Sequence, residues 1–188
     1  KIIQDFGENN IENHYEAGYI FARVGKGAAY QTRSLRINLD EFELSSENKR
    51  ILKKTENIDI FTKPLPYEDY RWHIHKLGKD FYSSKFGDKT FSANKIKELM
   101  TDADASNFNL VFVYHDKQQE KNEALGYCIS LQTENIIHYC YPFYDLDKSP
   151  KNMGLGMMIR AIEYAKNEGK KYIYLGSASR SSDKYKLQ

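Results

Sequence analysis

The most specific candidate for a chemical function in this sequence is a short glycine-containing loop. The segment Lys151-Asn152-Met153-Gly154-Leu155-Gly156 leads into an amphipathic stretch that predicts a helix over residues 155–167. The glycines at 154 and 156 leave backbone N–H groups uncovered where the helix macrodipole places about half a positive charge. Such a turn binds a pyrophosphate, a carboxylate or a nucleic-acid phosphate. The other interpretation is a close helix–strand crossing, which also requires small residues.

Histidines and cysteines offer fewer possibilities. His138 lies on an expected strand that enters the same region, so it is a candidate general base, and its alternative role is a structural hydrogen bond. His73 and His75 are two residues apart on an expected helix and point to different faces, so they cannot chelate one metal ion. The two cysteines, Cys128 and Cys140, provide neither a disulfide framework nor a four-ligand metal site. We therefore expect no metal cluster.

The elements around the loop predict a mixed α/β arrangement. Apolar runs at residues 109–114, 124–132 and 135–143 predict an antiparallel meander, with a charged hairpin loop at 116–123 and a tight Thr133-Glu134 connection. The helix at 155–167 follows, and Gly169 is positioned to end it as the left-handed residue after the cap. A last strand is expected at 171–175. This order places the glycine loop between a meander strand and an amphipathic helix, which favours the binding interpretation.

The first hundred residues predict shorter elements. Residues 1–17 are polar and without periodicity, so they form a loose arm or pack late, and strands are expected at 18–24 and 29–39. On the second of these strands Arg36 faces away from the apolar side, as a substrate ligand or as an ordinary edge-strand charge. Helices are expected from the Ser45 cap through Lys54, over 67–82, and over 92–100.

The overall composition indicates an ordinary globular chain. A length of 188 residues suits a single domain, and the net charge of +2 argues neither for nor against an RNA partner. The chain has no run of about 18 apolar residues, so we expect no membrane span and a cytoplasmic protein with reduced thiols.

The loop and the order of elements resemble the GNAT acyltransferases. In that family the donor loop is Gln/Arg-x-x-Gly-x-Gly/Ala, and this chain has Lys at the first position. The resemblance implies an α/β (α+β) fold with a central, mostly antiparallel twisted sheet flanked by helices. It also implies that the acyl donor is held by Lys151, Asn152, Met153, Gly154, Leu155 and Gly156.

Further segments resemble one branch of these enzymes, the aminoacyl-tRNA–protein transferases. The matching segments are residues 34–50, Tyr67 to His73, Phe143-Tyr144-Asp145, Tyr172 to Gly176, Arg180 and Tyr185-Lys186. The resemblance implies an N-terminal arm at 1–17 and a GNAT-like domain at 18–188. Residues 18–63 resemble a reduced, cysteine-free form of the family's N-terminal part.

This resemblance implies transfer of arginine or leucine from charged tRNA to the N-terminal amine of a protein or peptide. Aminoacyl-tRNA would be the co-substrate, with no bound cofactor and no membrane partner. Within this hypothesis His138 is the base, and Tyr144 and Asp145 orient the amine. The residues expected to contact acceptor or tRNA are Arg36, Arg71, Ser177, Arg180, Tyr185 and Lys186.

Two other functions remain open at this point. The Lys-x-x-Gly-x-Gly loop would equally suit an acetyl-CoA-dependent N-acetyltransferase. A non-catalytic domain that keeps the fold and binds protein N-termini or RNA ends would need no base. Binding of labelled acetyl-CoA favours the first alternative, and salt-sensitive binding of charged tRNA favours aminoacyl transfer.

Overall fold

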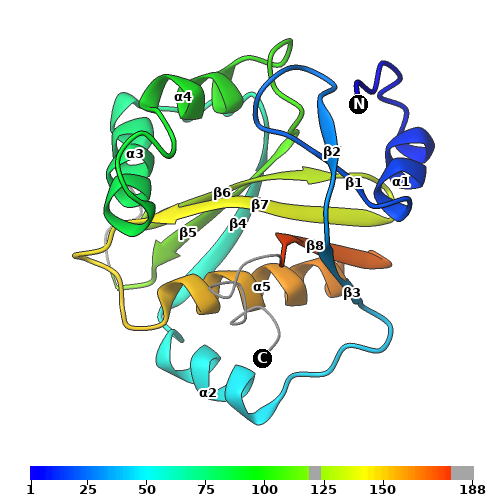
Figure 1. Cartoon of the computed structure of the whole chain (residues 1–188). Coiled ribbons are helices and arrows are strands. Elements are labelled where there is room, and N and C mark those ends of the chain that lie inside the picture. The colour runs from blue at the N-terminus through cyan, green and yellow to red at the C-terminus, as the bar shows by residue number, and fades with distance from the viewer. Residues whose placement is uncertain (119–123, 179–188) are drawn as a thin grey trace.

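The computed structural model describes residues 1–118 and 124–178, which contain five α-helices and eight strands. Their order is α1 (Glu8–Glu16), β1 (Tyr19–Phe21), β2 (Ala29–Gln31), β3 (Ser34–Asn38), α2 (Ser46–Lys54), β4 (Ile58–Pro64), α3 (Trp72–Phe86), α4 (Ala93–Thr101), β5 (Leu110–Asp116), β6 (Gly126–Gln132), β7 (Ile136–Tyr144), α5 (Met153–Asn167) and β8 (Tyr172–Ser177). Figure 1 follows these elements along the chain.

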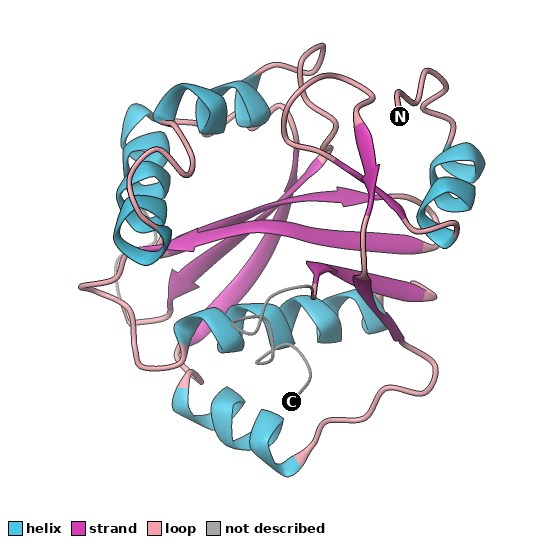
Figure 2. Cartoon of the chain, viewed as in Figure 1, coloured by secondary structure: helices cyan, strands magenta, loops and turns pink. Residues whose placement is uncertain are grey.

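One six-stranded sheet organises the molecule. Its strand order is β3-β8-β7-β6-β5-β4, and β1 and β2 form a separate two-stranded ribbon. Each neighbouring pair in the large sheet is antiparallel except β7 and β8, which are parallel. Helices α2 and α5 lie on one side of the sheet, and α1, α3 and α4 lie on the other (Figures 1 and 2). The expected α/β fold with a mostly antiparallel sheet is confirmed.

Each face of the sheet has its own apolar core. Helix α5 buries Met157, Ala161, Ile162 and Ala165 against one face, at the three-to-four-residue spacing of one helical stripe. The opposite core joins α3 and α4 to the N-terminal elements, so the described helices pack against the two faces of the sheet. At about 25 cal/mol per Å² of apolar area removed from water, this two-sided burial is the main stabilising contribution.

Local signals set several helix ends as expected. The Ser45 hydroxyl accepts a hydrogen bond from the Asn48 amide, and the Asn48 side-chain oxygen accepts one from the Ser45 amide, which completes a capping box at α2. Ser92 caps α4 by accepting from the Lys95 amide. Gly169 has φ of 70° after α5, a conformation that costs glycine little.

The N-terminal segment is the first departure from expectation. Residues 8–16 form a helix, and Ile11 and Tyr15 are buried in the core rather than in a loose arm. Glu12 fixes this helix to the β6–β7 turn, because its carboxylate accepts from the Thr133 hydroxyl and from both nitrogens of Asn135. Burial would raise the pKa of Glu12, but these hydrogen bonds outweigh it and the pKa is lowered. The helix lacks apolar periodicity because few of its residues face the core.

Three further element predictions are corrected. The single strand expected at 29–39 is two strands in different sheets, because β2 pairs with β1 while β3 pairs with β8. Helix α3 begins at Trp72 rather than at 67, since Tyr67 to Tyr70 forms a turn whose first amide donates to Met100. Strand β4 was not expected at all, although its residues alternate as a strand would.

Candidate active site

The parallel strands β7 and β8 separate toward their carboxyl ends. Their ladder consists of three residue pairs and ends at His138 opposite Tyr174, although β7 continues to Tyr144 and β8 to Ser177. Helix α5 begins beyond the end of β7, so its N-terminus lies near the carboxyl ends of these two strands (Figure 1). A crevice outside the carboxyl ends of parallel strands is the usual ligand site of an α/β sheet.

Strand β7 has a bulge just past the point where the ladder ends. Ile129 of β6 pairs with Tyr141 and Ser130 pairs with Tyr139, so Cys140 is the additional residue. Side-chain alternation is interrupted there, and Cys140 and Tyr141 both pack against the core on the α3 side. Burial raises the pKa of the Cys140 thiol well above its usual value, so this cysteine is not a thiolate nucleophile.

The glycine loop differs from the predicted arrangement in one respect. Helix α5 starts at Met153, and the Gly156 amide already donates to the Asn152 carbonyl at 2.9 Å. A Cβ at position 156 would lie 2.6 Å from the Thr55 hydroxyl oxygen, so Gly156 allows α2 and α5 to pack closely. The prediction that the Gly156 amide is exposed to a ligand is wrong, because the fourth residue of a helix uses its N–H within the helix.

Gly154, in contrast, adjoins a predicted site residue. A Cβ there would lie 3.4 Å from the hydroxyl oxygen of Tyr144, and the Gly154 amide donates a hydrogen bond to that hydroxyl. Burial raises the pKa of Tyr144, and the Gly154 amide lowers it by a smaller amount. The phenol is therefore protonated near neutral pH and can donate a hydrogen bond.

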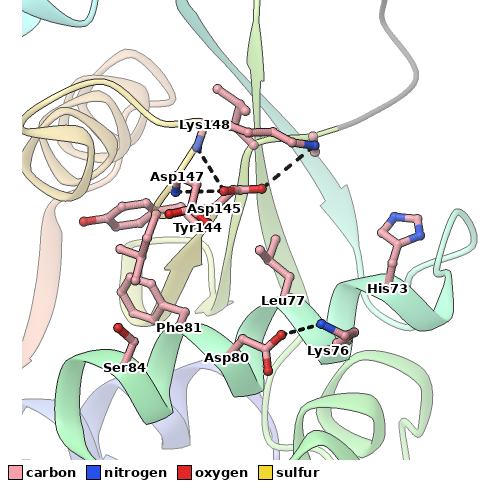
Figure 3. A pocket seen from close by; sticks show the side chains of 13 residues that line it. His73, Lys76, Leu77, Asp80, Phe81, Ser84, Tyr144, Asp145, Asp147 and Lys148 are labelled. Atoms are coloured by element: carbon pink, nitrogen blue, oxygen red, sulfur yellow. Dashed lines mark hydrogen bonds and ion pairs between the residues drawn. The ribbon is translucent and has the colours of Figure 1, made fainter.

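Tyr144 and Asp145 line a cavity of about 450 Å³ between α3 and the β7–α5 loop (Figure 3). Asp145 Oδ1 accepts from the amides of Asp147 (2.9 Å) and Lys148 (3.0 Å), which hold the carboxylate in place. Its Oδ2 lies 3.9 Å from Lys148 Nζ, at the outer limit of an ion pair. The carboxylate therefore has capacity to accept a further hydrogen bond from a ligand.

Helix α3 forms the facing wall of this cavity. Lys76 and Asp80 form an ion pair at 2.7 Å, and His73 lies one turn before Lys76 on the helix (Figure 3). The Phe81 ring packs on Tyr144 with a centroid separation of 4.8 Å. The wall thus combines charged groups at its rim with an aromatic contact that fixes the Tyr144 ring.

A second cavity of about 690 Å³, lined by residues of β4 and β5, adjoins the first. Both are lined by His73 and Ala124, which form their common boundary. Arg71, one of the predicted acceptor or tRNA ligands, lines the second cavity at the start of α3.

The remaining predicted residues lie elsewhere or outside the described part. His138 is buried and its Nδ1 lies 2.9 Å from the Tyr15 hydroxyl, which makes it a structural hydrogen-bonding residue rather than a base. Arg36 stacks on Tyr172 in a small hollow beside α1, away from the glycine loop. Ser177 accepts from the Thr32 hydroxyl at the end of β8. Arg180, Tyr185 and Lys186 lie outside the described residues.

Sequence reasoning missed the walls of both cavities. It did not single out Asp80 or Asp147, or the β4 residues Asp59 and Phe61, because these residues become neighbours only after folding. The alternation of β-branched residues along Ile58, Ile60 and Thr62 was the available signal for β4.

The sheet with its separated parallel strands, the bulge and the helix N-terminus define a GNAT-type architecture. This chain belongs to the family described as "Arginine-tRNA-protein transferase, C terminus", whose model matches residues 65–188. That range contains α3, both cavities' shared boundary, Tyr144, Asp145 and α5.

Individual proteins support the same assignment. The chain is 20% identical over 150 residues to an aspartate/glutamate leucyltransferase of Pseudoalteromonas atlantica, covering 80% of this chain and 62% of that protein. The chain thus spans less than two thirds of this relative's length.

Solved structures show the same fold. L-PGS from Bacillus licheniformis has a TM-score of 0.58 at 14% identity, over 92% of this chain and 52% of that one. The GCN5-related glucosamine N-acetyltransferase region of a fungal multi-domain beta-N-acetylglucosaminidase has a TM-score of 0.52 at 10% identity, over 97% and 22%. In residues 1–118 and 124–178, no helix has the length and apolar character needed to cross a membrane.

Proposed function

We propose that this chain transfers an arginyl or leucyl group from charged tRNA to the N-terminal amine of a protein or peptide. The observation that carries the proposal is the family match over residues 65–188, which includes the edge where Tyr144, Asp145 and the α5 N-terminus meet. The relative from Pseudoalteromonas atlantica is named for leucyl transfer and for aspartate and glutamate. Because charged tRNA is a cytoplasmic substrate, we also propose that the protein acts in the cytoplasm.

The reaction joins an amine to an activated ester. The amine nitrogen forms a bond to the aminoacyl carbonyl carbon, and the bond from that carbon to the ribose oxygen of tRNA breaks. Starting from the ammonium form, two protons leave the nitrogen, one of which ends on the ribose hydroxyl and the other in solvent. No enzyme nucleophile is required, so the protein contributes positioning, hydrogen bonding and charge.

Asp145 would receive the acceptor amine. Its Oδ1 is held by two backbone amides, while its Oδ2 lies 3.9 Å from the Lys148 ammonium. An ammonium or amine N–H that donates to Oδ2 would be fixed at the mouth of the cavity. Charge-assisted hydrogen bonds of this kind are roughly twice as strong as neutral ones.

Tyr144 would donate its proton toward the reacting oxygen atoms. Its pKa is raised by burial, so the hydroxyl is protonated when the reaction occurs. The Gly154 amide donates to the same oxygen, which polarises the hydroxyl and strengthens its own donation. This pair would stabilise negative charge on the carbonyl or on the leaving ribose oxygen.

The loop before α5 would hold the donor. The first turn of the helix provides positive potential, and Lys148 and Lys151 are exposed on the loop that precedes it. These groups suit the phosphates near the 3′ end of tRNA. Lysine contributes charge there without the planar geometry of arginine.

A direct assay tests the proposal. The protein is incubated with leucyl-tRNA or arginyl-tRNA and with peptides that begin with Asp, Glu, Arg or Lys, and the products are measured by mass spectrometry. The expected result is a mass gain of one leucyl or arginyl residue on at least one peptide, lost in Asp145→Asn. A lack of gain with every pair would contradict the proposal.

An N-acetyltransferase is the second candidate, favoured by the Lys-x-x-Gly-x-Gly loop and by the GCN5-related structural neighbour. The same peptides incubated with acetyl-CoA distinguish the two. Acetylation without aminoacyl transfer would replace the first proposal while leaving the fold and the roles of Tyr144 and Asp145 in place.

A further inference from the structure

The second cavity has a composition different from that of the first. Its floor is the exposed face of β4 and β5, where Phe61 is 52% exposed and lies edge-on to His115 with a centroid separation of 5.5 Å. Tyr67 and Tyr127, which also line this cavity, form another edge-to-face pair with a centroid separation of 6.2 Å. The cavity therefore offers an apolar, aromatic floor to a ligand.

Among the described residues that line the cavity, charges of both signs surround this floor in equal number. The permanent cations are Lys63, Arg71 and Lys117, and the carboxylates are Asp59, Asp69 and Asp116. One of the possible pairs is already formed, since Lys117 lies 3.2 Å from Asp59. The three carboxylates offset the three cations, so a polyanion such as RNA would gain no net attraction here, whereas the backbone of a polypeptide carries no charge.

The position of the cavity also favours a polypeptide. It adjoins the first cavity at His73 and Ala124, which line both, and Asp145 lines the first cavity. An extended chain advances about 3.3 Å per residue, so a peptide whose first residue is at Asp145 can continue across this boundary. Its alternate side chains would then face the floor formed by Phe61.

We infer that this cavity, named here the β4 groove, binds the residues that follow the N-terminal residue of the acceptor polypeptide. The inference rests on the proposed function, because it takes the amine to be at Asp145. The β4 groove selects extended, unfolded N-terminal segments over single amino acids or folded termini. Phe61 contributes by burying its exposed ring under a peptide side chain.

A series of acceptor peptides of increasing length tests this inference. Peptides of two to six residues share one N-terminal residue, and steady-state transfer kinetics are measured for the wild-type chain and for Phe61→Ala. Phe86→Ala is the matched control, since Phe86 is 60% exposed near the end of α3 and does not line the β4 groove.

The expected result is a KM that falls about tenfold from the dipeptide to the longer peptides in the wild-type chain. Phe61→Ala should remove this fall in KM with peptide length, while Phe86→Ala should retain it. A KM that does not depend on length, or equal effects of the two alanine variants, would overturn the inference.

Direct binding separates this inference from the transfer reaction itself. Fluorescence anisotropy with a six-residue peptide labelled at its C-terminus requires no donor, so it applies even if no transfer is observed. Weaker binding to Phe61→Ala supports the β4 groove. The same measurement is made with a labelled single-stranded RNA. The inference would be overturned if Phe61→Ala weakened binding of the RNA and left binding of the peptide unchanged.

Discussion

A Cβ placed on Gly154 would lie 3.4 Å from the hydroxyl oxygen of Tyr144, and the Gly154 amide donates to that oxygen. The first turn of α5 and the end of β7 therefore meet at a protonated phenol beside a carboxylate. The contact has a structural basis on both sides, because Phe81 packs on the Tyr144 ring and Gly126 opposite Tyr144 has no space for a side chain.

Removal of the Tyr144 hydroxyl should slow the chemical step. We expect Tyr144→Phe to lower kcat by about 100-fold, in the range of general acid–base and hydrogen-bond contributions. The free energy of unfolding should change by less than about 1 kcal/mol, since the ring contacts remain. Transfer kinetics and urea unfolding measure the two effects. An unchanged kcat would exclude the phenol from the reaction.

The two loop glycines should respond differently to alanine. Gly156→Ala places a methyl group 2.6 Å from the Thr55 hydroxyl oxygen, and Arg160 also binds that hydroxyl, so we expect a loss of about 1–2 kcal/mol in the free energy of unfolding. Gly154→Ala meets its nearest atoms at 3.4 Å and should keep or slightly raise stability, because alanine favours the helix. Because the added methyl group would contact the ring and hydroxyl of Tyr144, we expect Gly154→Ala to lower kcat. Chemical denaturation of both variants makes the comparison, and equal losses would contradict it.

The hydrogen bond between Tyr15 and His138 should matter for stability and not for catalysis. We expect Tyr15→Phe to cost about 1–3 kcal/mol, because it leaves the buried His138 Nδ1 and the Phe21 amide without this partner. The pH profile of kcat should be the same as in the wild-type chain. If the profile shifts, His138 takes part in proton transfer after all.

Glu12 should make stability depend on acid. Its folded-state pKa is lowered below the ordinary value of 4.5, so its stabilising contribution is present above that value and is lost as the pH falls through the folded-state pKa. We expect Glu12→Gln to be less stable than the wild-type chain at pH 7, and the difference to shrink below about pH 4.5. Urea unfolding over this pH range is the measurement. A difference that is constant with pH would show that Glu12 acts without its charge.

Several features of the chain follow from its sequence because they depend on neighbouring residues. The spacing of Met158, Ile162 and Ala165 defines the buried side of α5, and the hydroxyls of Ser45 and Ser92 set the starts of two helices. The meander of β5, β6 and β7 was also predictable, since each strand is an apolar run and the three runs follow one another along the chain. In the site, the adjacency of Tyr144 and Asp145 is given by the chain itself.

Other features depend on residues that are far apart in the sequence. Ser34 pairs with Ser177, and Tyr15 reaches His138 across 123 positions, so neither contact leaves a periodic signal near either residue. The role of Gly156 was decided by Thr55, and the two cavities were decided by the approach of α3 and β4 to the end of β7. Sequence patterns report the side of an element that is apolar, whereas the partner on that side is chosen by the packing of the whole chain.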